Sequence, residues 1–316
     1  MEWNIMSKRE AVVMGRNYSS LLGMCRCAGE AGCEVSVIRL VKRIPKKTKM
    51  SRYTIERKSK YVVDYDYAVE PDEEALIKKL LKKFAGKKNV ILLPTDDFVA
   101  EAIDQNIERL KDIFVFPNIG MKQNEVCYWM DKGNQKKWAT ECGLNSPKGW
   151  SVAVKDGNYT MIDDVIYPCF TKPQTAIDNR KRYMKRCNNK EELKELLDNV
   201  AANVNCDILI EQFVVIEKEY GVCGFSNGTD VVCPSLVYKE MTGSGSHEGV
   251  TLLGHVMDFD KYPDLQNKIK TFIRKLGFVG LFDIDLYEAD GVMYFCELNM
   301  RLGAFGYAVN LAGVNL

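Results

Sequence analysis

The residues best suited to chemistry lie near the C-terminal end of the chain, in two short runs. Asp283 and Asp285 alternate with apolar residues in the first run, and Glu297, Asn299 and Arg301 alternate with apolar residues in the second. Carboxylate and amide oxygens are the hard ligands that Mg2+ takes together with phosphate oxygens. A guanidinium beside them would stabilise an acyl phosphate or a tetrahedral oxyanion. We therefore predict a magnesium site with an arginine next to it.

The two runs are expected to be the strands of a hairpin. Ala289-Asp290-Gly291 suits a three-residue loop with a left-handed glycine, so that residues of like parity share a face. A two-residue Asp-Gly loop would instead split the carboxylates between opposite faces. On the predicted pairing Met293 and Phe295 share the acidic side, which favours a partly dry cleft over a solvated face, because carboxylates there need cations. The side chains expected to point into a core are Phe282, Ile284 and Leu286.

The spacing of these residues resembles a known signature. Asp285 precedes the run Glu297-Leu298-Asn299-Met300-Arg301 by twelve positions (297 minus 285), which is similar to the metal-binding and catalytic motif of the ATP-grasp superfamily. The resemblance implies that Asp285 and Glu297 bind two Mg2+ ions, with Mn2+ as an alternative, and that Asn299 is a third ligand. It implies that Arg301 stabilises the reacting intermediate. Asp283 has no counterpart in the motif.

Length and composition narrow the class of protein. A chain of 316 residues is long enough for two or three compact units, and 44 basic against 43 acidic residues give no reason to expect nucleic acid or a membrane as a partner. No apolar run approaches the length of a membrane span, and residues 1–16 lack the core of a signal peptide. Eleven scattered cysteines without a Cys-x-x-Cys pair suit a reducing compartment, and only two histidines argue against histidine-based chemistry. We expect a cytoplasmic protein.

The first part of the chain has the pattern of an open α/β sheet. A strand at 11–15, a helix at 19–31 and a strand at 34–40 predict a βαβ opening, without the Gly-x-Gly-x-x-Gly of a dinucleotide site. Thr95-Asp96-Asp97 follows a buried strand at 89–94, at the end of the strand where ligands bind in such sheets. The same residues would also cap the next helix, so both interpretations stay open.

Two lysines are candidates for phosphate contacts. Residues 121–141 are expected to be helical and broken by Gly133, with Lys132 near the start of the second half. Pro173 holds Lys172 extended at the end of a strand. The ATP-grasp resemblance implies that Lys132 contacts the α-phosphate of ATP, although it could also be a surface lysine, and that Lys172 makes a second phosphate contact. The following loop, 173–182, has no glycine where relatives carry a glycine-rich loop, and its basic cluster is weak evidence for nucleic-acid binding.

A continuous apolar strand at 207–214 ends in polar residues. Taken alone it is a core strand with a carboxylate at its edge. The resemblance makes it the hinge between two lobes, with Glu211 and the backbone of Gln212, Phe213 and Val214 meeting adenine and Glu219 meeting the ribose. Lys239 ends a later strand and is a candidate for the γ-phosphate or the carboxylate substrate.

Three features complete the predicted cleft. The glycine-rich segment 241–249, with His247, is expected to be a flexible loop. A helix at 261–276, stopped by Gly277, leads into the hairpin. Gly303 and Gly306 are predicted to let the backbone approach a ligand closely.

Together these features imply an α/β ATP-grasp fold. An open parallel α/β domain at 1–119 would precede two lobes at 120–206 and 207–316, the second shortened at its C-terminal end. The resemblance implies a carboxylate-amine ligase of the D-aspartate ligase-like branch, which forms an amide or peptide bond through an acyl phosphate and releases ADP and phosphate. Its partners would be a small carboxylate and a small amine, both amino-acid-like, whose identity the sequence does not give, nor does it give the oligomeric state. The alternatives are a kinase or carboxylase with another acceptor, and a non-catalytic nucleotide-binding protein.

Overall fold

A computed structural model describes residues 9–44, 54–174, 180–243 and 251–316. Contacts divide the chain into two compact units, each built from separate segments. The first comprises Met1–Cys127, Gly221–Ile284 and Leu298–Leu316, and the second comprises Tyr128–Tyr220 and Asp285–Glu297. The predicted division at residues 119 and 206 stays a prediction of domain organisation.

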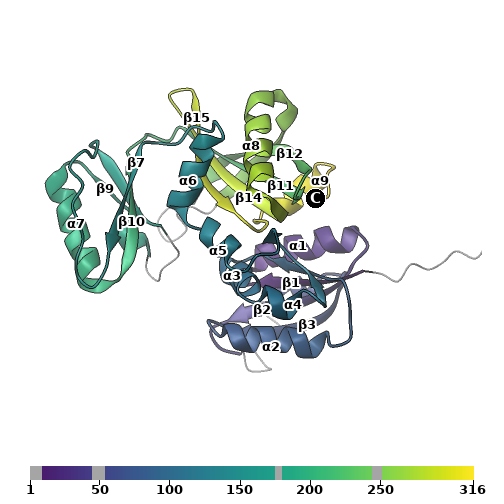
Figure 1. The fold of residues 1–316 in the computed structure, drawn as a ribbon. Helices are drawn as coiled ribbons and strands as arrows, with labels where there is room; N and C mark the ends of the chain where they lie inside the picture. Colours follow the sequence, from purple (N-terminus) through teal and green to yellow (C-terminus); the bar gives the residue numbers. More distant parts are fainter. Residues whose placement is uncertain (1–8, 45–53, 175–179, 244–250) are drawn as a thin grey trace, which may run out of the picture. The chain divides into compact units, whose positions relative to one another are not determined.

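The first unit contains a parallel sheet with strand order β3-β2-β1-β4-β5. Its strands are β1 (Glu10–Gly15), β2 (Glu34–Val41), β3 (Val62–Val69), β4 (Val90–Pro94) and β5 (Phe114–Val115). The predicted βαβ opening is therefore confirmed (Figure 1). The strand order reverses beside β1, which brings the carboxyl ends of β1 and β4 together at the switch point where open α/β sheets bind ligands.

Helices cover both faces of this sheet. Alternate residues of β1 enter different cores: Val12 and Met14 pack with Leu76 of α2, whereas Val13 packs with Leu21 of α1. Burial on both faces explains why the strands are continuous apolar runs. Side chains of Asn17, Asp72 and Asp96 accept hydrogen bonds from backbone amides at the starts of α1, α2 and α3. The helices are α1 (Tyr18–Glu30), α2 (Glu73–Lys83), α3 (Asp97–Asp104) and α4 (Ile107–Leu110), with a short 3-10 helix, η2 (Ile55–Lys58).

A second sheet has strand order β13-β12-β11-β14-β15, and β6 pairs with β14. Within the first unit α8 packs against β12, and α9 packs against α1. Gly277 ends α8 in the left-handed conformation, with φ of 70°, as predicted. The elements are β6 (Asn118–Ile119), β11 (Lys218–Asn227), β12 (Val231–Thr242), β13 (Thr251–Asp258), η5 (Phe259–Lys261), α8 (Pro263–Leu276), β14 (Phe278–Ala289), β15 (Val292–Asn299) and α9 (Gly306–Leu311). Residues of β11, β14 and β15 belong partly to each unit.

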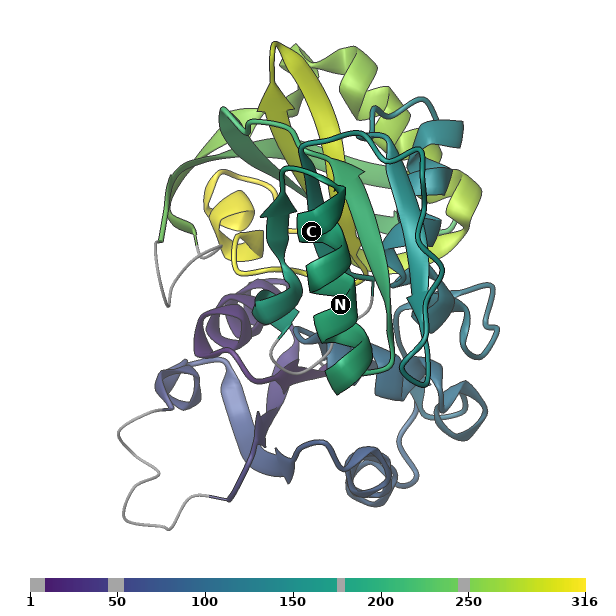
Figure 2. The ribbon, with the colours of Figure 1, turned by 90° about the vertical axis from the view of Figure 1, so that its left-hand side faces the viewer.

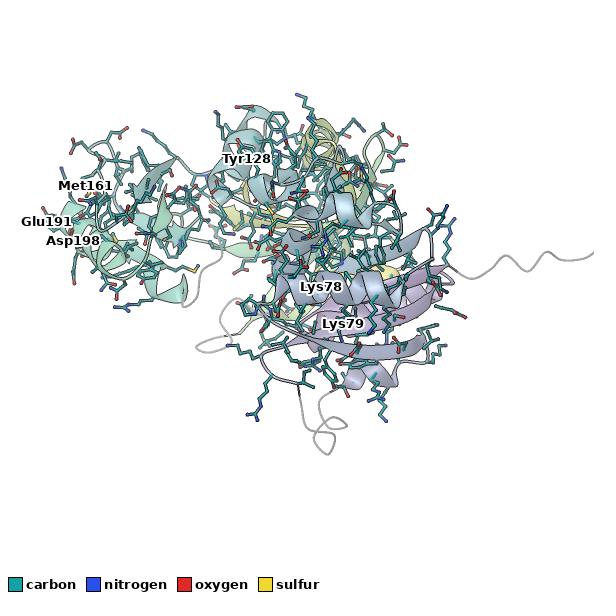
Figure 3. The ribbon with its side chains drawn as sticks, turned by 60° about the horizontal axis from the view of Figure 1, so that its bottom comes forward. Lys78, Lys79, Tyr128, Met161, Glu191 and Asp198 are labelled. Carbon is teal, nitrogen blue, oxygen red and sulfur yellow. The ribbon has the colours of Figure 1, made fainter. Side chains whose placement is uncertain are left out.

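The second unit contains an antiparallel sheet with strand order β7-β10-β8-β9. Its strands are β7 (Gly149–Val154), β8 (Cys169–Pro173), β9 (Lys185–Cys187) and β10 (Cys206–Gln212). A short 3-10 helix, η3 (Arg180–Tyr183), lies between β8 and β9 in the chain. Figure 2 shows α7 (Lys190–Asn203) lying along one face of this sheet, where Leu193 and Leu197 pack against Ile208 and Ile210. Glu191 and Asp198 project from the exposed side of α7 (Figure 3).

The segment 121–141 forms two helices, but the break is not at Gly133. α5 (Glu125–Trp129) ends before Asp131, and α6 (Lys132–Glu141) begins directly after it. The Asp131 side chain caps α6 by accepting a hydrogen bond of 2.9 Å from Asn134 N. Gly133 lies inside α6, where a Cβ atom would come within 2.3 Å of Gln174 Oε1. The glycine therefore serves close packing in the second unit.

The predicted three-residue hairpin loop is wrong. β14 and β15 are joined by a two-residue turn, Asp290-Gly291, with φ of 49° and 72°, the conformation of a type I′ turn. Next to the turn Tyr287 stacks on Tyr294, with ring centroids 5.4 Å apart, so odd and even positions pair there. Phe295 is fully buried, on the side of Leu286, and does not share a face with the acids.

The burial pattern of β15 changes phase along the strand. Phe295 and Leu298 are both buried although they are three positions apart, which indicates one extra residue between them in β15. Beyond that point Glu297 and Asn299 flank buried Leu298 as Asp283 and Asp285 flank buried Ile284. The prediction that Phe282, Ile284 and Leu286 enter a core is confirmed.

Candidate functional site

Glu211 is the centre of a buried charge cluster in the second unit. It lies on β10, next to β8, and its Oε2 atom is 2.7 Å from Lys172 Nζ. Its Oε1 atom accepts a hydrogen bond from Lys136 of α6. Only 5% of Glu211 is exposed, and a buried carboxylate is tolerable only with such partners. The structure thus brings the predicted residues Lys172 and Glu211 together.

Lys136 is a residue that the sequence interpretation missed. Burial lowers its pKa well below the usual lysine value, and the nearby ammonium of Lys172 lowers the pKa further, with Lys132 acting in the same direction. The available signal was its spacing: Lys132 and Lys136 are four positions apart and so lie on one face of α6.

Lys132 occupies the first turn of α6 and forms an ion pair with Glu297 of β15. The Asp131 cap fixes where the helix begins and therefore where this ammonium group lies. Lys132, Lys136 and Lys172 gather beside the two carboxylates of Glu211 and Glu297. Because the lowered pKa of Lys136 disfavours its charged form, Lys132 and Lys172 are the ammonium groups that can contact an anionic ligand.

The predicted hinge comprises the end of β10 and the residues directly after it. Gln212 N donates a hydrogen bond of 2.8 Å to Lys148 O, and Phe213 N donates one of 2.9 Å to Pro168 O. The guanidinium of Arg186 lies 4.5 Å from the centroid of the Phe213 ring. Val214, like Phe213, is half-buried, and Glu219 is half-buried at the start of β11. The roles predicted for these residues toward adenine and ribose stay predictions.

The donors predicted for magnesium are all oxygen atoms on β14 and β15. Asp285 and Glu297 are partly exposed, so their carboxylates are accessible, and Lys132 neutralises Glu297 in the ligand-free protein. In the first unit Asn299 Oδ1 accepts a hydrogen bond of 3.3 Å from Arg301 Nη2. In the described parts of the chain no three His, Cys, Asp or Glu side chains gather closely enough to form a metal cluster by themselves. Two acids and an amide still fit a cation that takes its remaining ligands from phosphate and water.

Arg301 is held by a carboxylate of the first unit. Its Nε atom donates a hydrogen bond of 2.6 Å to Asp97 Oδ1, at the start of α3. Burial opposes the charge of the guanidinium, but Asp97, Asp283 and Asp96 together outweigh burial and raise the pKa of Arg301. The predicted arginine is thus fixed at the switch-point edge of the parallel sheet.

Asp96 caps α3, as one of the two interpretations of the sequence predicted, while a ligand role stays a prediction. Its Oδ1 atom accepts the capping hydrogen bond of 3.1 Å from Phe98 N and lies 3.0 Å from Arg16 Nη2. Arg16 Nε also lies 2.5 Å from Glu70 Oε2, so the carboxyl ends of β1, β3 and β4 share one charged network. Burial raises the pKa of Asp96; Arg16 opposes this shift and Asp97 adds to it.

Lys239 lies beside Asp283 in the first unit. A Cβ atom on Gly221 would be 3.6 Å from Lys239 Cε and 3.7 Å from Asp283 Oδ1, so both side chains border the same position of β11. The prediction for Gly303 and Gly306 needs correction. A Cβ on Gly303 would come within 2.2 Å of Asp283 Oδ2, and one on Gly306 within 2.1 Å of Leu302, so protein side chains fill these spaces.

An apolar cavity of about 170 Å³ adjoins Arg301 in the first unit. Leu93 and Pro94 of β4, Phe116 and Leu281 contribute to its walls. The cavity offers a hydrophobic surface beside the guanidinium.

Parts of two predicted loops lie outside the described residues. These are 175–179 in the basic loop, with the side chains of residues 180 and 181, and 244–250, which includes His247. In the described residues no helix is both long and apolar enough to cross a membrane.

The parallel α/β unit, the antiparallel sheets and their connections define the class of fold: it is the α/β ATP-grasp fold predicted from the sequence. Solved structures share it along almost the whole chain. An L-amino acid ligase from Bacillus licheniformis has a TM-score of 0.64 and 18% identity, covering 95% of this chain and 68% of that chain. An N5-carboxyaminoimidazole synthetase from Staphylococcus aureus complexed with ADP has a TM-score of 0.64 and 16% identity, covering 95% and 72%. The VanG D-Ala:D-Ser ligase from Enterococcus faecalis has a TM-score of 0.62 and 15% identity, covering 98% and 96%.

Curated sequences point to larger relatives. The carbamoyl phosphate synthase large chain of Gemmatimonas aurantiaca is 24% identical over 183 residues, which are 56% of this chain and 16% of that protein. The same protein of Neisseria meningitidis serogroup B is 23% identical over 186 residues, 58% of this chain and 17% of that protein. The chain therefore matches about a sixth of the length of these relatives. No protein-family model matches the sequence.

Proposed function

We propose that this protein is an ATP-dependent carboxylate-amine ligase that forms an amide or peptide bond and releases ADP and phosphate. The observation that carries the proposal is the lysine-glutamate cluster of the second unit. There, residues named by the ATP-grasp motif pair as Lys132 with Glu297 and Lys172 with Glu211. The fold shared with solved ligases supports it.

The nucleotide would bind along this cluster. Lys132 and Lys172 would contact phosphate groups, because they are the ammonium groups that this cluster offers to an anion. Glu211 and the backbone of Gln212, Phe213 and Val214 would meet adenine, and Glu219 the ribose. When the nucleotide binds, the ion pair between Lys136 and Glu211 would break, or Glu211 would contact Lys136 and the nucleotide together. We also propose that Asp285, Glu297 and Asn299 hold Mg2+, or Mn2+ in its place, which when bound would screen the triphosphate charge.

The reaction would proceed in two transfers. An oxygen of the carboxylate attacks the γ-phosphorus, the bond to the bridging oxygen of the β-phosphate breaks, and ADP leaves. The amine nitrogen then attacks the carbonyl carbon of the acyl phosphate, inorganic phosphate leaves, and the amine loses a proton to water. Arg301, fixed by Asp97, would stabilise the oxyanion of the second step, and Lys239 would attract the carboxylate or the γ-phosphate.

Both substrates are proposed to be small and amino-acid-like, as the names of several solved neighbours suggest. We also propose the finer assignment to the D-aspartate ligase-like branch and a cytoplasmic location. Small groups would find an apolar surface beside Arg301.

The test is ADP release measured with pools of carboxylates and amines in the presence of Mg2+. A ligase needs one compound from each pool, and we expect turnover only with both. ADP formed with a single acceptor would identify a kinase or carboxylase. Nucleotide binding without turnover in any combination would identify a non-catalytic binding protein.

A further inference from the structure

A cavity of about 440 Å³ lies in the second unit between α6 and the strands β7 and β10. Cavities of this size hold small organic ligands. Three lysines line it, Lys136, Lys137 and Lys148, and its described lining contains no carboxylate. None of the proposed nucleotide, metal or catalytic residues, apart from the neighbouring Lys136, belongs to the lining.

The cavity has a buried floor and an exposed rim. Lys136, Gln174 and Leu209 on the floor are 6%, 4% and 4% exposed. Lys137 and Lys148 on the rim are exposed to solvent, one from α6 and the other from the segment before β7. Positive charge from two separate elements therefore converges on one opening, which a solvated helix face would not produce.

The rim lysines are not neutralised by the protein. Lys136 is paired with Glu211, but in the described part of the chain Lys137 and Lys148 form no ion pair. Lys148 Nζ lies 5.1 Å from the centroid of the Trp150 ring, which also lines the cavity. Two unneutralised lysines in the lining, one of them beside an indole ring, provide charge and a flat apolar surface together.

Ser146 supplies an independent observation. The residue lines the cavity, and its buried hydroxyl oxygen has no hydrogen-bond partner among the described residues. Leaving such a group unsatisfied costs about 1 to 3 kcal/mol. An acceptor atom of a ligand in the cavity would satisfy the hydroxyl and recover this free energy.

We propose that this cavity binds a phosphate monoester with a flat organic part, at a site additional to the nucleotide site. The dianionic phosphate matches the two rim ammonium groups and accepts a hydrogen bond from Ser146. The flat part packs against Trp150 and Leu209. The inference rests on the cavity itself and does not require the ligase function.

The experiment is calorimetric titration of the full chain with phenyl phosphate, in the presence of Mg2+ and saturating ADP to occupy any nucleotide site. Phenyl phosphate is expected to bind with a submillimolar Kd. Inorganic phosphate should bind about tenfold more weakly, because it lacks the ring, and this ratio corresponds to about 1.4 kcal/mol. Equal affinity for the two probes would overturn the proposed ring contact.

Charge reversal locates the site. Lys137→Glu and Lys148→Glu should each weaken phenyl phosphate binding about tenfold or more, since a repulsive charge replaces an attractive one. Lys155→Glu is the matched control. Lys155 is an exposed lysine of the same unit that lies outside the cavity, and its substitution changes the net charge by the same amount. The proposal fails if all three variants bind alike, or if phenyl phosphate binds only when ADP is omitted.

Ser146→Ala separates binding from folding. Removing an unsatisfied hydroxyl should leave the melting temperature of the ligand-free protein unchanged or higher, while phenyl phosphate binding weakens about three- to tenfold. Unchanged affinity would show that the hydroxyl does not contact the ligand and would overturn the proposed pose.

Discussion

At the scale of single residues, Glu297 has two possible partners. In the structure its carboxylate is paired with Lys132, and in the proposed complex it binds a metal ion. A side chain that exchanges a lysine for a metal must stay partly exposed, and 30% of the Glu297 side chain is exposed. The ion pair is therefore compatible with a binding role and does not mark Glu297 as purely structural.

Glu297→Ala is expected to lower ADP release by more than about 100-fold, because it removes a metal ligand and the ion pair between Glu297 and Lys132. ADP release under substrate-pool conditions measures this. The control is Glu217→Ala, since Glu217 is exposed and forms no side-chain ion pair among the described residues. If Glu297→Ala releases ADP as fast as the control, the proposed metal site is wrong.

Asp97 positions Arg301 through a hydrogen bond of 2.6 Å. Asp97→Asn should reduce kcat about 10- to 100-fold, because a small displacement of the guanidinium misplaces its donors, while KM for ATP changes little. Steady-state kinetics with both substrates give the kcat and KM values separately. Asp112→Asn, an exposed aspartate of the same unit, is the control. Equal kcat values for the two variants would exclude a positioning role for Asp97.

The sequence revealed these residues unequally. Glu297, Asn299 and Arg301 form one compact motif, so their types and spacing were enough to select them. Asp97 lies 204 positions before Arg301, and no local pattern indicates that the two side chains meet. Lys136 was missed because an i+4 lysine on a helix is ordinarily a solvated side chain, and only its burial distinguishes it.

At the scale of elements, the β14-β15 hairpin shows why the loop prediction failed. Asp290-Gly291 adopts positive φ at both positions, which favours a two-residue turn. The burial pattern of β15 also changes phase between Phe295 and Leu298. Strand periodicity read from sequence assumes an uninterrupted alternation, so a prediction based on it could not include this irregularity.

The turn gives a stability prediction. Gly291→Ala should destabilise the protein by about 1 kcal/mol, because alanine is strained at φ of 72°. Asp290→Asn should change stability much less, since asparagine also favours the left-handed region. Urea unfolding of both variants measures the difference. A Gly291→Ala variant as stable as Asp290→Asn would contradict the strained turn.

Glu288 joins the beginning of β11 to the end of β14 in the second unit. The Tyr220 hydroxyl donates a hydrogen bond of 2.8 Å to its carboxylate and Lys218 Nζ one of 3.0 Å, and these bonds lower the pKa of Glu288. The ionised form is therefore favoured in the folded state. Its stabilisation is present above the unfolded pKa of about 4.3 and is lost as the pH falls through the folded pKa.

Glu288→Gln should lower the free energy of unfolding by about 0.5 kcal/mol at pH 7, a modest value because Lys218 is half-exposed and solvent screens it. The difference from the unaltered protein should shrink toward zero below about pH 4. Urea unfolding at both pH values tests this, with the exposed Glu141→Gln as control. A difference that does not depend on pH would show that the carboxylate charge is not responsible.

At the scale of the whole molecule, the fold class predicted from the sequence is confirmed, whereas the predicted domain division stays a prediction. The βαβ opening follows from local alternation of strand and helix patterns, and it was confirmed. The first unit, however, is assembled from three separate segments of the chain, and its later strands pair across long stretches of sequence. Local hydrophobic periodicity does not encode which distant strands pair, because the buried faces of many strands look alike.

The division into two units predicts which elements nucleotide binding will protect from hydrogen exchange. Lys132, Lys172 and Glu211 all belong to the second unit, so Mg2+ and ADP together should slow hydrogen exchange most in β8, β10 and the first turn of α6. At a free ADP concentration of about 100 times Kd, binding raises the free energy of opening by about 2.7 kcal/mol. Amides that exchange only from the nucleotide-free form should therefore exchange about a hundredfold more slowly. Hydrogen exchange followed by mass spectrometry resolves these elements.

Adding a chelator should remove most of the protection if Asp285 and Glu297 hold the metal ion, while amides of α2 in the first unit serve as an internal reference. Protection spread equally over α2 and β10, or unaffected by the chelator, would mean that the charge cluster is not the metal-dependent nucleotide site.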